Sequence, residues 1–260
     1  GEKVVISGSK QITDWSKNRD KTWRTTVKDQ VVELIANDKR QMLARTPNSG
    51  FLYTADQPTD PAFFKFRDGD LANWENLESN RVVITIRWGR NTRTITKVDE
   101  KNNIAWLSEP SEDMLYVPPK YYVENVKALI DTAGEWFYDN NSKVLTYLPD
   151  VDIKNPNKAN IVTPYLNQLV KVQGTRENPV RNLRLYNLEF ANTLPGGSGT
   201  IALVYTKNCE ILENTIANVS QTAITLGKGC YNDLIKRNTI HDIKGSGISI
   251  GGGPKPETWD

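Results

Sequence analysis

The side chains best suited to acid–base chemistry lie close to the C-terminal end of this sequence. Asp242, Glu257 and Asp260 supply carboxyl groups there, and His241, the only histidine, directly precedes Asp242. Carboxyl groups can act as general acid, general base or nucleophile, and an imidazole can act as acid or base near neutral pH. These three acids are therefore the candidate catalytic residues, with ordinary polar turns as the alternative interpretation.

Three further side chains could contact a substrate. Trp136 could stack on the apolar face of a ring, Lys171 could pair with an anionic group, and His241 could act as an acid, a base or a ligand. The alternative for Trp136 is a place in the core. The alternative for His241 is a turn position stacked on Ala217 of the preceding repeat.

A basic run offers another kind of site. The stretch RVVITIRWGRNTRTITK carries five cations, namely Arg81, Arg87, Arg90, Arg93 and Lys97. Such a run could bind a polyanion, or it could form the solvated face and charged edge of a strand pair. The residues alone favour the second interpretation.

Cofactor chemistry has no motif here. The GGSG and GGG stretches lack the helix and the Lys-Ser/Thr pair of a phosphate-binding loop. No cluster of Cys and His predicts zinc, and no Asp-x-Asp-x-Asp-Gly loop predicts an EF-hand calcium site. We therefore predict neither a cofactor nor a metal, and calcium would have to bind without such a motif.

The elements that position these residues follow from a repeat in the last hundred residues. Three similar segments are led by Asn182, Asn208 and Asn232, which are 26 and 24 positions apart, and a second short strand follows each. This period leaves too little length for helices, so it predicts a parallel β-helix of stacked coils. The leading asparagines, together with Asn214 and Asn238, should form amide ladders along its axis.

Alternation within the strands predicts which side chains face inward. Ile224 and Ile248 should lie one above the other in the aliphatic interior, while a second column should point outward. That outward column consists of Lys171, Ala202, Thr225 and Ser249. It contains no acid, so it cannot supply a catalytic pair.

The whole chain then divides into four regions. Residues 1–15 form the first β-helix strands, and residues 16–122 form an inserted antiparallel β subdomain rich in short strands and turns. Residues 123–159 hold a short helix and a hairpin, EWFYD-NNSK-VLTYL, in which Gly134 permits the preceding reversal. The helix is predicted from the spacing of Val123, Val126, Leu129 and Ile130. Residues 160–260 form the β-helix coils, incomplete at the C-terminus.

Composition restricts partners and location. Lys and Arg number 33 against 31 Asp and Glu, a net charge of +2, which gives no electrostatic argument for nucleic acid or a membrane surface. No apolar run approaches about 18 residues, so no membrane span is predicted. The sequence shows no signal peptide and opens on a strand pattern, so we expect a targeting segment to be absent from it.

The two cysteines are expected to be free thiols. Cys209 and Cys230 fall in neighbouring coils but out of register, which separates them by roughly 8–11 Å. A disulfide needs Cα atoms within about 7 Å.

Four stretches together resemble a known group of proteins. They are GEKVVISGSKQITDW, LARTPNSGF, YYVENVKALIDTAGEWFYDNNSKVLTYLP and LVKVQGT…NPVRNLRLYNLEF. In this order they resemble secreted bacterial right-handed parallel β-helix proteins of the glycoside hydrolase type, such as family 141, which includes α-L-fucosidase and xylanase activities. The resemblance covers most of the chain and rests on structural rather than catalytic motifs.

The resemblance implies a secreted, periplasmic or cell-surface protein with a pectin lyase-like scaffold that hydrolyses a polysaccharide or glycan. Its main catalytic acids would lie beyond residue 260, so this piece should be inactive, and the open end of its coils could associate with another copy. A polysaccharide lyase or epimerase acting on uronate polymers is the first alternative, with Lys171 and the 81–93 run as its hint. A non-catalytic carbohydrate-binding or adhesion protein is the second, and fold alone does not decide between these functions.

Overall fold

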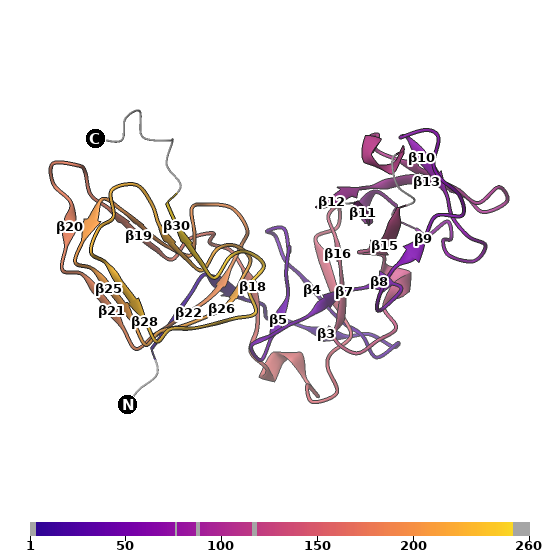
Figure 1. Ribbon diagram of the computed structural model, residues 1–260. Helices are drawn as coiled ribbons and strands as arrows, with labels where there is room; N and C mark the ends of the chain where they lie inside the picture. Colours follow the sequence, from indigo (N-terminus) through magenta and orange to yellow (C-terminus); the bar gives the residue numbers. More distant parts are fainter. Residues whose placement is uncertain (1–3, 76, 87–88, 116–118, 252–260) are drawn as a thin grey trace. The chain divides into compact units, whose positions relative to one another are not determined.

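A computed structural model describes residues 4–75, 77–86, 89–115 and 119–251 (Figure 1). The described part is all-β with almost no helix, because its helical segments are 3-10 turns of three or four residues. Within it, no helix has the length and apolar character needed to cross a membrane. The chain forms two compact units. Residues 1–12, 32–40 and 160–260 make the coil unit, and residues 13–31 and 41–159 make the insert unit.

Four parallel sheets build the coil unit, and in three of them every strand pairs with the equivalent strand of the next repeat. The fourth starts with β1 and continues in the same way. Their strands are β19 (Val170–Gln173), β23 (Ile201–Val204), β27 (Ile224–Leu226) and β30 (Ile248–Ile250); β20 (Val180–Arg181) and β24 (Thr206–Lys207); β21 (Arg184–Tyr186), β25 (Glu210–Leu212) and β28 (Leu234–Lys236); and β1 (Val4–Ser7), β22 (Leu188–Thr193), β26 (Thr215–Val219) and β29 (Thr239–His241).

Register in these sheets fills the interior with apolar side chains. Ile201 pairs with Ile224, and Ile224 pairs with Ile248, which confirms the predicted stacking of the last two. Phe190 and Ile216 form an equivalent inward pair in the fourth sheet, and both are fully buried. The two cysteines lie among these residues as free thiols, as predicted.

Left-handed backbone corners recur every five residues in each coil. Positive φ angles occur in three successive sets, Asn182, Asn187 and Asn192; Asn208, Glu213 and Asn218; and Asn232, Arg237 and Asp242. Short polar side chains enter this conformation more readily than other L-residues because they can bond locally. The column of leading asparagines therefore marks where the coil turns, whereas Asn214 and Asn238 directly follow a left-handed residue.

The predicted amide ladder is present in the described coils. The backbone N–H and the amide Nδ2 of Asn214 donate to Asn238 Oδ1 at 2.9 and 3.0 Å. Asn214 Oδ1 in turn accepts from the backbone N–H of Leu188 at 3.0 Å. A second rung joins Asn232 to Asn208 in the column of leading asparagines. Because Asn214 is buried, these bonds satisfy polar groups that water does not reach.

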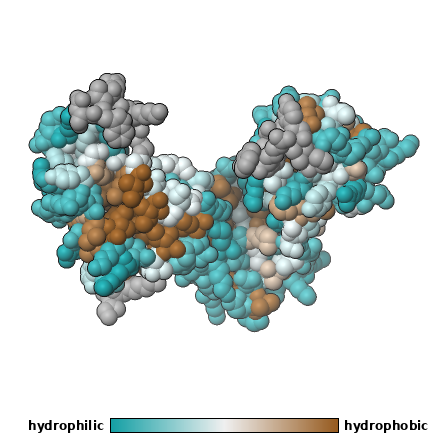
Figure 2. Space-filling view, in the orientation of Figure 1, coloured by the Kyte–Doolittle hydropathy of each residue, from teal (hydrophilic) through white to brown (hydrophobic). Residues whose placement is uncertain are grey.

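The last described coil leaves apolar side chains uncovered. Ile248 and Ile250 are exposed, although Ile224 and Leu226, their partners one coil earlier, are buried. Figure 2 shows an apolar area on the visible face of the coil unit.

A second kind of sheet in the coil unit is antiparallel. Its order is β2 (Ser9–Gln11), β18 (Ile161–Pro164), β5 (Ile35–Ala36) and β6 (Lys39–Arg40). Asn37 and Asp38 turn the β5–β6 hairpin with positive φ angles. Residues 32–40 were predicted in the inserted subdomain, whereas in the structure they belong to the coil unit, where Ile35 and Ala36 pair with β18.

The insert unit contains a five-stranded sheet around the predicted hairpin. Its order is β3 (Ser16–Lys17), β4 (Trp23–Thr26), β17 (Val144–Tyr147), β16 (Glu135–Asp139) and β7 (Met42–Leu43). Trp136 lies opposite Tyr147, and Tyr138 lies opposite Leu145, so the four side chains share a face as expected. All four are buried.

Two further sheets complete the insert unit and share one core. One has the order β12 (Gly89–Arg93), β11 (Arg81–Ile86), β15 (Lys120–Glu124) and β8 (Arg45–Thr46), with β9 (Leu52–Tyr53) also on β15. The other has the order β10 (Phe63–Lys65), β14 (Ile104–Leu107) and β13 (Ile95–Asp99). Phe64, Ile84 and Tyr121 are central to the core between them.

The helix predicted from Val123 to Ile130 is wrong. The structure has strand β15 up to Glu124 and then only a 3-10 turn, Lys127–Leu129. Asn125 separates the two with a φ of 58°, which a continuous helix cannot contain. The apolar spacing that suggested a helix arises because Val123 and Val126 enter the core from the strand and from the loop after it.

Candidate functional site

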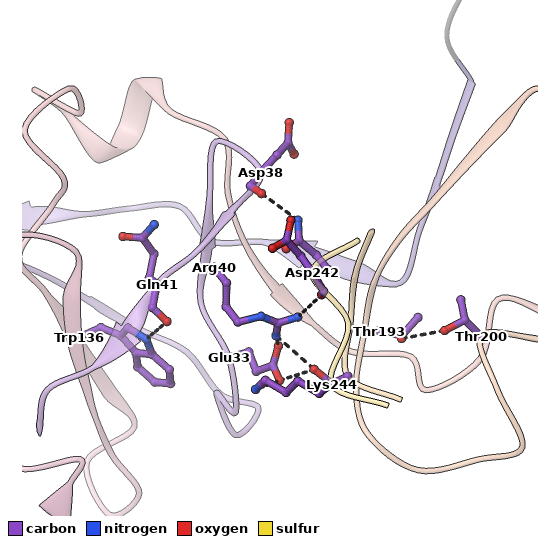
Figure 3. Close-up of polar contacts among 11 residues, drawn as sticks. Glu33, Asp38, Arg40, Gln41, Trp136, Thr193, Thr200, Asp242 and Lys244 are labelled. Carbon is purple, nitrogen blue, oxygen red and sulfur yellow. Dashed lines mark hydrogen bonds and ion pairs between the residues drawn. The ribbon is translucent and has the colours of Figure 1, made fainter. Parts of the chain in front are cut away.

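A polar cluster gathers where the β5–β6 hairpin meets the turns after β26 and β29. We call it the Glu33 cluster, and it consists of Glu33, Arg40, Ser220, His241, Asp242 and Lys244. Figure 3 shows Glu33, Arg40, Asp242 and Lys244 of this cluster. All six residues belong to the coil unit.

Glu33 is the centre of this cluster. Its side chain is 5% exposed, and it forms ion pairs with Arg40 and with Lys244, whose Nζ lies 2.6 Å from Oε1. The hydroxyl of Ser220 also donates to Oε1. Opposite charges at this range favour the ionised carboxylate, so Glu33 is poorly suited to donate a proton.

Arg40 links the carboxylate to the coil turns. Its Nη1 donates to Ser220 Oγ at 3.1 Å, and its Nη2 donates to the backbone carbonyl of Asp242 at 3.2 Å. Burial lowers the pKa of the Arg40 guanidinium, while the charge of Asp242 acts in the opposite direction. The hairpin is held further by Asn218, whose Nδ2 donates to the carbonyl of Asp38 at 2.8 Å.

His241 and Asp242 form an exposed dyad beside these bonds. His241 Nδ1 lies 2.7 Å from Asp242 Oδ2, and the side chains are 50% and 65% exposed. A neutral imidazole that donates from Nδ1 keeps Nε2 as an acceptor. The dyad therefore has the hydrogen-bond arrangement of an oriented general base.

Comparison with known proteins gives one informative likeness. No protein-family model and no curated protein matches the chain. A solved structure named "Glycoside hydrolase" has a TM-score of 0.82 at 16% identity, over 96% of this chain and 54% of that chain. The fold is glycoside-hydrolase-like. A structure named "The complex structure of XylC with xylose" has a TM-score of 0.43 at 16% identity, over 96% and 41%. The chain thus spans about half the length of the first of these structures.

Within this glycoside-hydrolase-like fold, the predicted site residues are dispersed. Asp242 and His241 meet in the dyad, and His241 also stacks on Ala217 in register, as the alternative interpretation predicted. Lys171 is exposed on β19 and pairs with Ala202, which pairs in turn with Thr225. Ala202 is buried, so the predicted outward column is not exposed along its whole length. Glu257 and Asp260 lie outside the described residues.

Trp136 cannot stack on a sugar in this structure. It is 2% exposed in the insert unit, and its indole N–H donates to the carbonyl of Gln41 at 3.3 Å. Tyr147 completes this buried group by donating its hydroxyl to Gln41 Oε1 at 2.9 Å. The alternative interpretation, a place in the core, is the one the structure supports.

Sequence reasoning missed Glu33, Arg40 and Lys244. The available signal was a single acid inside the apolar run VVELIA, since a charge within a predicted buried strand needs a partner. Its partner Lys244 is more than 200 positions away from Glu33 in the sequence, and no local pattern reveals such a partner. In the described part of the chain, no group of three or more His, Cys, Asp or Glu is placed to hold a metal ion.

Proposed function

We propose that this chain belongs to a carbohydrate-active protein that hydrolyses glycosidic bonds on a right-handed parallel β-helix. The observation that carries the proposal is the TM-score of 0.82 to a structure named "Glycoside hydrolase" over 96% of the chain. The in-register parallel sheets, with aliphatic columns inside and polar corners outside, fit such a scaffold.

The finer proposal is an activity like that of family 141, α-L-fucosidase or xylanase, in a secreted bacterial protein. Its catalytic acids would come mainly from coils beyond residue 260. Two observations support this placement. The first is that the predicted outward column of β19, β23, β27 and β30 carries Lys171, Ala202, Thr225 and Ser249, none of which is an acid. The second is that the chain matches 54% of the similar structure.

In this proposal the Glu33 cluster fixes the hairpin and presents the dyad. Two cations and a hydroxyl hold the Glu33 carboxylate, and Arg40 holds the Asp242 backbone. His241 is then positioned to accept or donate a hydrogen bond with a sugar hydroxyl through Nε2. It would contact substrate while the carboxylates of other coils carry the bond cleavage.

The test compares the 260-residue chain with the product of its complete coding sequence. Both are incubated with xylan, fucosylated oligosaccharides and polygalacturonate, and reducing ends and unsaturated uronate absorbance are measured. We expect the complete product to release reducing ends without that absorbance, and the 260-residue chain to release none. Turnover by the 260-residue chain would contradict the placement of the catalytic acids.

Two other outcomes would replace the hydrolase proposal. New uronate absorbance would indicate the lyase or epimerase, for which the exposed Lys171 is a candidate base. Glycan binding without turnover by the complete product would indicate a binding or adhesion protein. Absence of both binding and turnover would overturn the carbohydrate assignment itself.

Self-association through the end of the coils stays a separate prediction. Leu234, Ile248 and Ile250 are exposed there, and an unpaired strand edge can template a further strand. Sedimentation of the 260-residue chain at increasing concentration tests it, with a strictly monomeric species as the contradicting result.

A further inference from the structure

One face of a sheet in the insert unit combines cations with stacked aromatic rings. In the sheet of β12, β11, β15 and β8, Val82, Ile84, Tyr121 and Val123 point into the core. The residues between them point to the opposite face. Cross-strand register arranges that face in three rows: Arg90, Thr85 and Lys120, with Tyr53 beyond; Thr92, Val83 and Tyr122; and Arg81, Glu124 and Arg45. We call this the Tyr122 face.

Aromatic rings and cations alternate along the Tyr122 face. The Nζ of Lys120 lies 4.4 Å from the ring centre of Phe51, and the rings of Phe51 and Tyr122 are 6.0 Å apart. The guanidinium carbon of Arg45 lies 3.8 Å from the ring centre of Tyr122. The four side chains therefore form one continuous stack, which fixes the positions of its cations.

Charge on this face is not balanced. Arg81, Arg90, Lys120 and Arg45 contribute four positive charges, whereas Glu124 is the single acid in the three rows. Glu124 is already paired with Arg81 at 2.9 Å. Arg45 donates to the carbonyls of Pro47 and Gly50, both at 2.8 Å, so its role is largely structural.

Arg90 and Lys120 remain as the cations that a ligand can reach. Arg90 is exposed and Lys120 is partly exposed, and neither forms an ion pair with an acid within the described ranges. They lie on either side of Thr85 in the same row. Two cations flanking a hydroxyl can bind an oxyanion.

Unmet hydrogen-bonding capacity lies on the same face. Arg81 Nε and Thr85 Oγ1 are buried atoms with no hydrogen-bond partner among the described residues. A buried donor without a partner is costly, so a group that accepts from it would be bound favourably. The pKa of Tyr122 is raised, first by burial and then by Glu124, while Arg90, Arg45 and Arg81 oppose the shift.

We propose that the Tyr122 face binds the anionic group of a glycan, either a uronate carboxylate or a sulfate ester, with Arg90 and Lys120 as its contacts. The anion chemistry follows from these two cations and from the unpartnered Thr85 hydroxyl between them, and the glycan as its carrier rests on the proposed function. The wider chain carries a net charge of only +2, so this is a local site on a nearly neutral protein. A neutral protein of this kind has little attraction for nucleic acid in general.

Binding of defined polymers to the 260-residue chain tests the site. Polygalacturonate oligosaccharides provide carboxylates, dextran sulfate provides sulfates, and unmodified dextran provides neither. We expect one anionic probe to bind and dextran not to bind. Which probe binds more tightly identifies the source of the anion, and the affinity should fall with added salt because exposed charges are screened.

Substitution of the contacts separates this site from a general charge effect. Arg90→Gln should weaken the Kd for the anionic probe about tenfold, and the double change with Lys120→Gln should weaken it further. The matched control is Lys101→Gln, which removes one exposed charge in the turn between β13 and β14 of the same unit. The control should leave binding unchanged, and circular dichroism should show all variants folded.

Several results would overturn the inference. If the Arg90→Gln variant binds the anionic probe as tightly as the native chain does, Arg90 is not a contact. If duplex DNA binds as tightly as the probe at the same salt concentration, the face is a general polyanion surface. If no anionic probe binds, but neutral glycans are still bound or turned over by the Arg90→Gln variant, the site is wrong and the proposed function stands. Anionic binding without turnover by the complete product would defeat the hydrolase but leave the site.

Discussion

In the coil unit a strand pairs with its counterpart one repeat away, as β23 does with β27, whereas in the insert unit β16 and β17 pair across the loop of residues 140–143. Aliphatic columns fill the coil unit, while the largest fully buried side chains of the insert unit are aromatic, led by Trp136, Tyr121, Tyr138 and Tyr147. The coil unit distributes its stability over many similar contacts. The insert unit concentrates it in a few large ones, so single substitutions should affect the two units differently.

The largest effect is expected for Trp136→Ala. This change removes a fully enclosed indole and leaves a cavity that the hairpin cannot close, at a cost of about 3–5 kcal/mol in the free energy of unfolding. Chemical denaturation, monitored by the hydrogen exchange of backbone amides in each unit, measures this loss of stability. Loss of protection should be largest in residues 41–159. A cost below about 1 kcal/mol would show that the aromatic side chains do not carry the insert unit.

A smaller effect is expected for Glu33→Gln in the coil unit. The amide keeps the shape but loses two charge-assisted contacts, to Arg40 and Lys244, at a cost of about 1–3 kcal/mol. Lys244→Gln is the control, because that lysine is 53% exposed and its loss leaves the Glu33 contacts to Arg40 and Ser220 in place, so it should cost less. If the two variants unfold at the same denaturant concentration, the buried carboxylate does not hold the hairpin.

The coil corners can be tested with a pair of substitutions at one position. Asn208 has a φ of 55°, a conformation that costs other L-residues about 1–2 kcal/mol. Asn208→Ala should therefore destabilise the coil unit by about that amount, and Asn208→Gly should cost clearly less. Thermal unfolding compares the two variants. An alanine variant as stable as the glycine variant would argue against the left-handed corner.

The smallest effect is expected at alkaline pH, where the insert unit should lose more stability than the coil unit. Burial raises the pKa of Tyr121 and of Tyr147 above the ordinary value of 10.0, and both lie in the insert unit. Above that value the unfolded chain loses phenolic protons that the folded chain retains, so stability falls as the pH rises. Hydrogen exchange at increasing pH, corrected for its intrinsic rate, should show the insert unit opening before the coil unit. The reverse order would contradict the burial of these phenols.

Most of the coil unit could be predicted from the sequence because its signals repeat. The leading asparagines recur 26 and 24 positions apart, a strand with aliphatic alternation follows each, and each copy supports the interpretation of the others. The segment 32–40 could not be placed, because β5 pairs with β18 more than a hundred positions later and nothing local in VVELIA specifies that partner.

The candidate site was predicted only where it is local. Asp242 and His241 are neighbours in the chain, so their dyad was within reach, whereas Glu33 joins them only through the fold. Trp136 was a weak candidate because an aromatic residue in a hairpin suits a core as well as a ligand, and burial decides the matter. The helix error has the same origin, since a strand followed by a turn can reproduce helical spacing over two turns.

The stacked register of the coils is the claim on which the rest depends, and a designed cross-link measures it most directly. Thr225 and Ser249 pair in register on adjacent strands, where Cα atoms lie about 4.8 Å apart, a distance a disulfide can span. Under mild oxidation the Thr225→Cys, Ser249→Cys variant should form this bond, identified by mass spectrometry of the linked peptides. The Thr225→Cys, Gly247→Cys variant, two positions out of register, should not. Equal or reversed cross-linking of the two variants would contradict the stack.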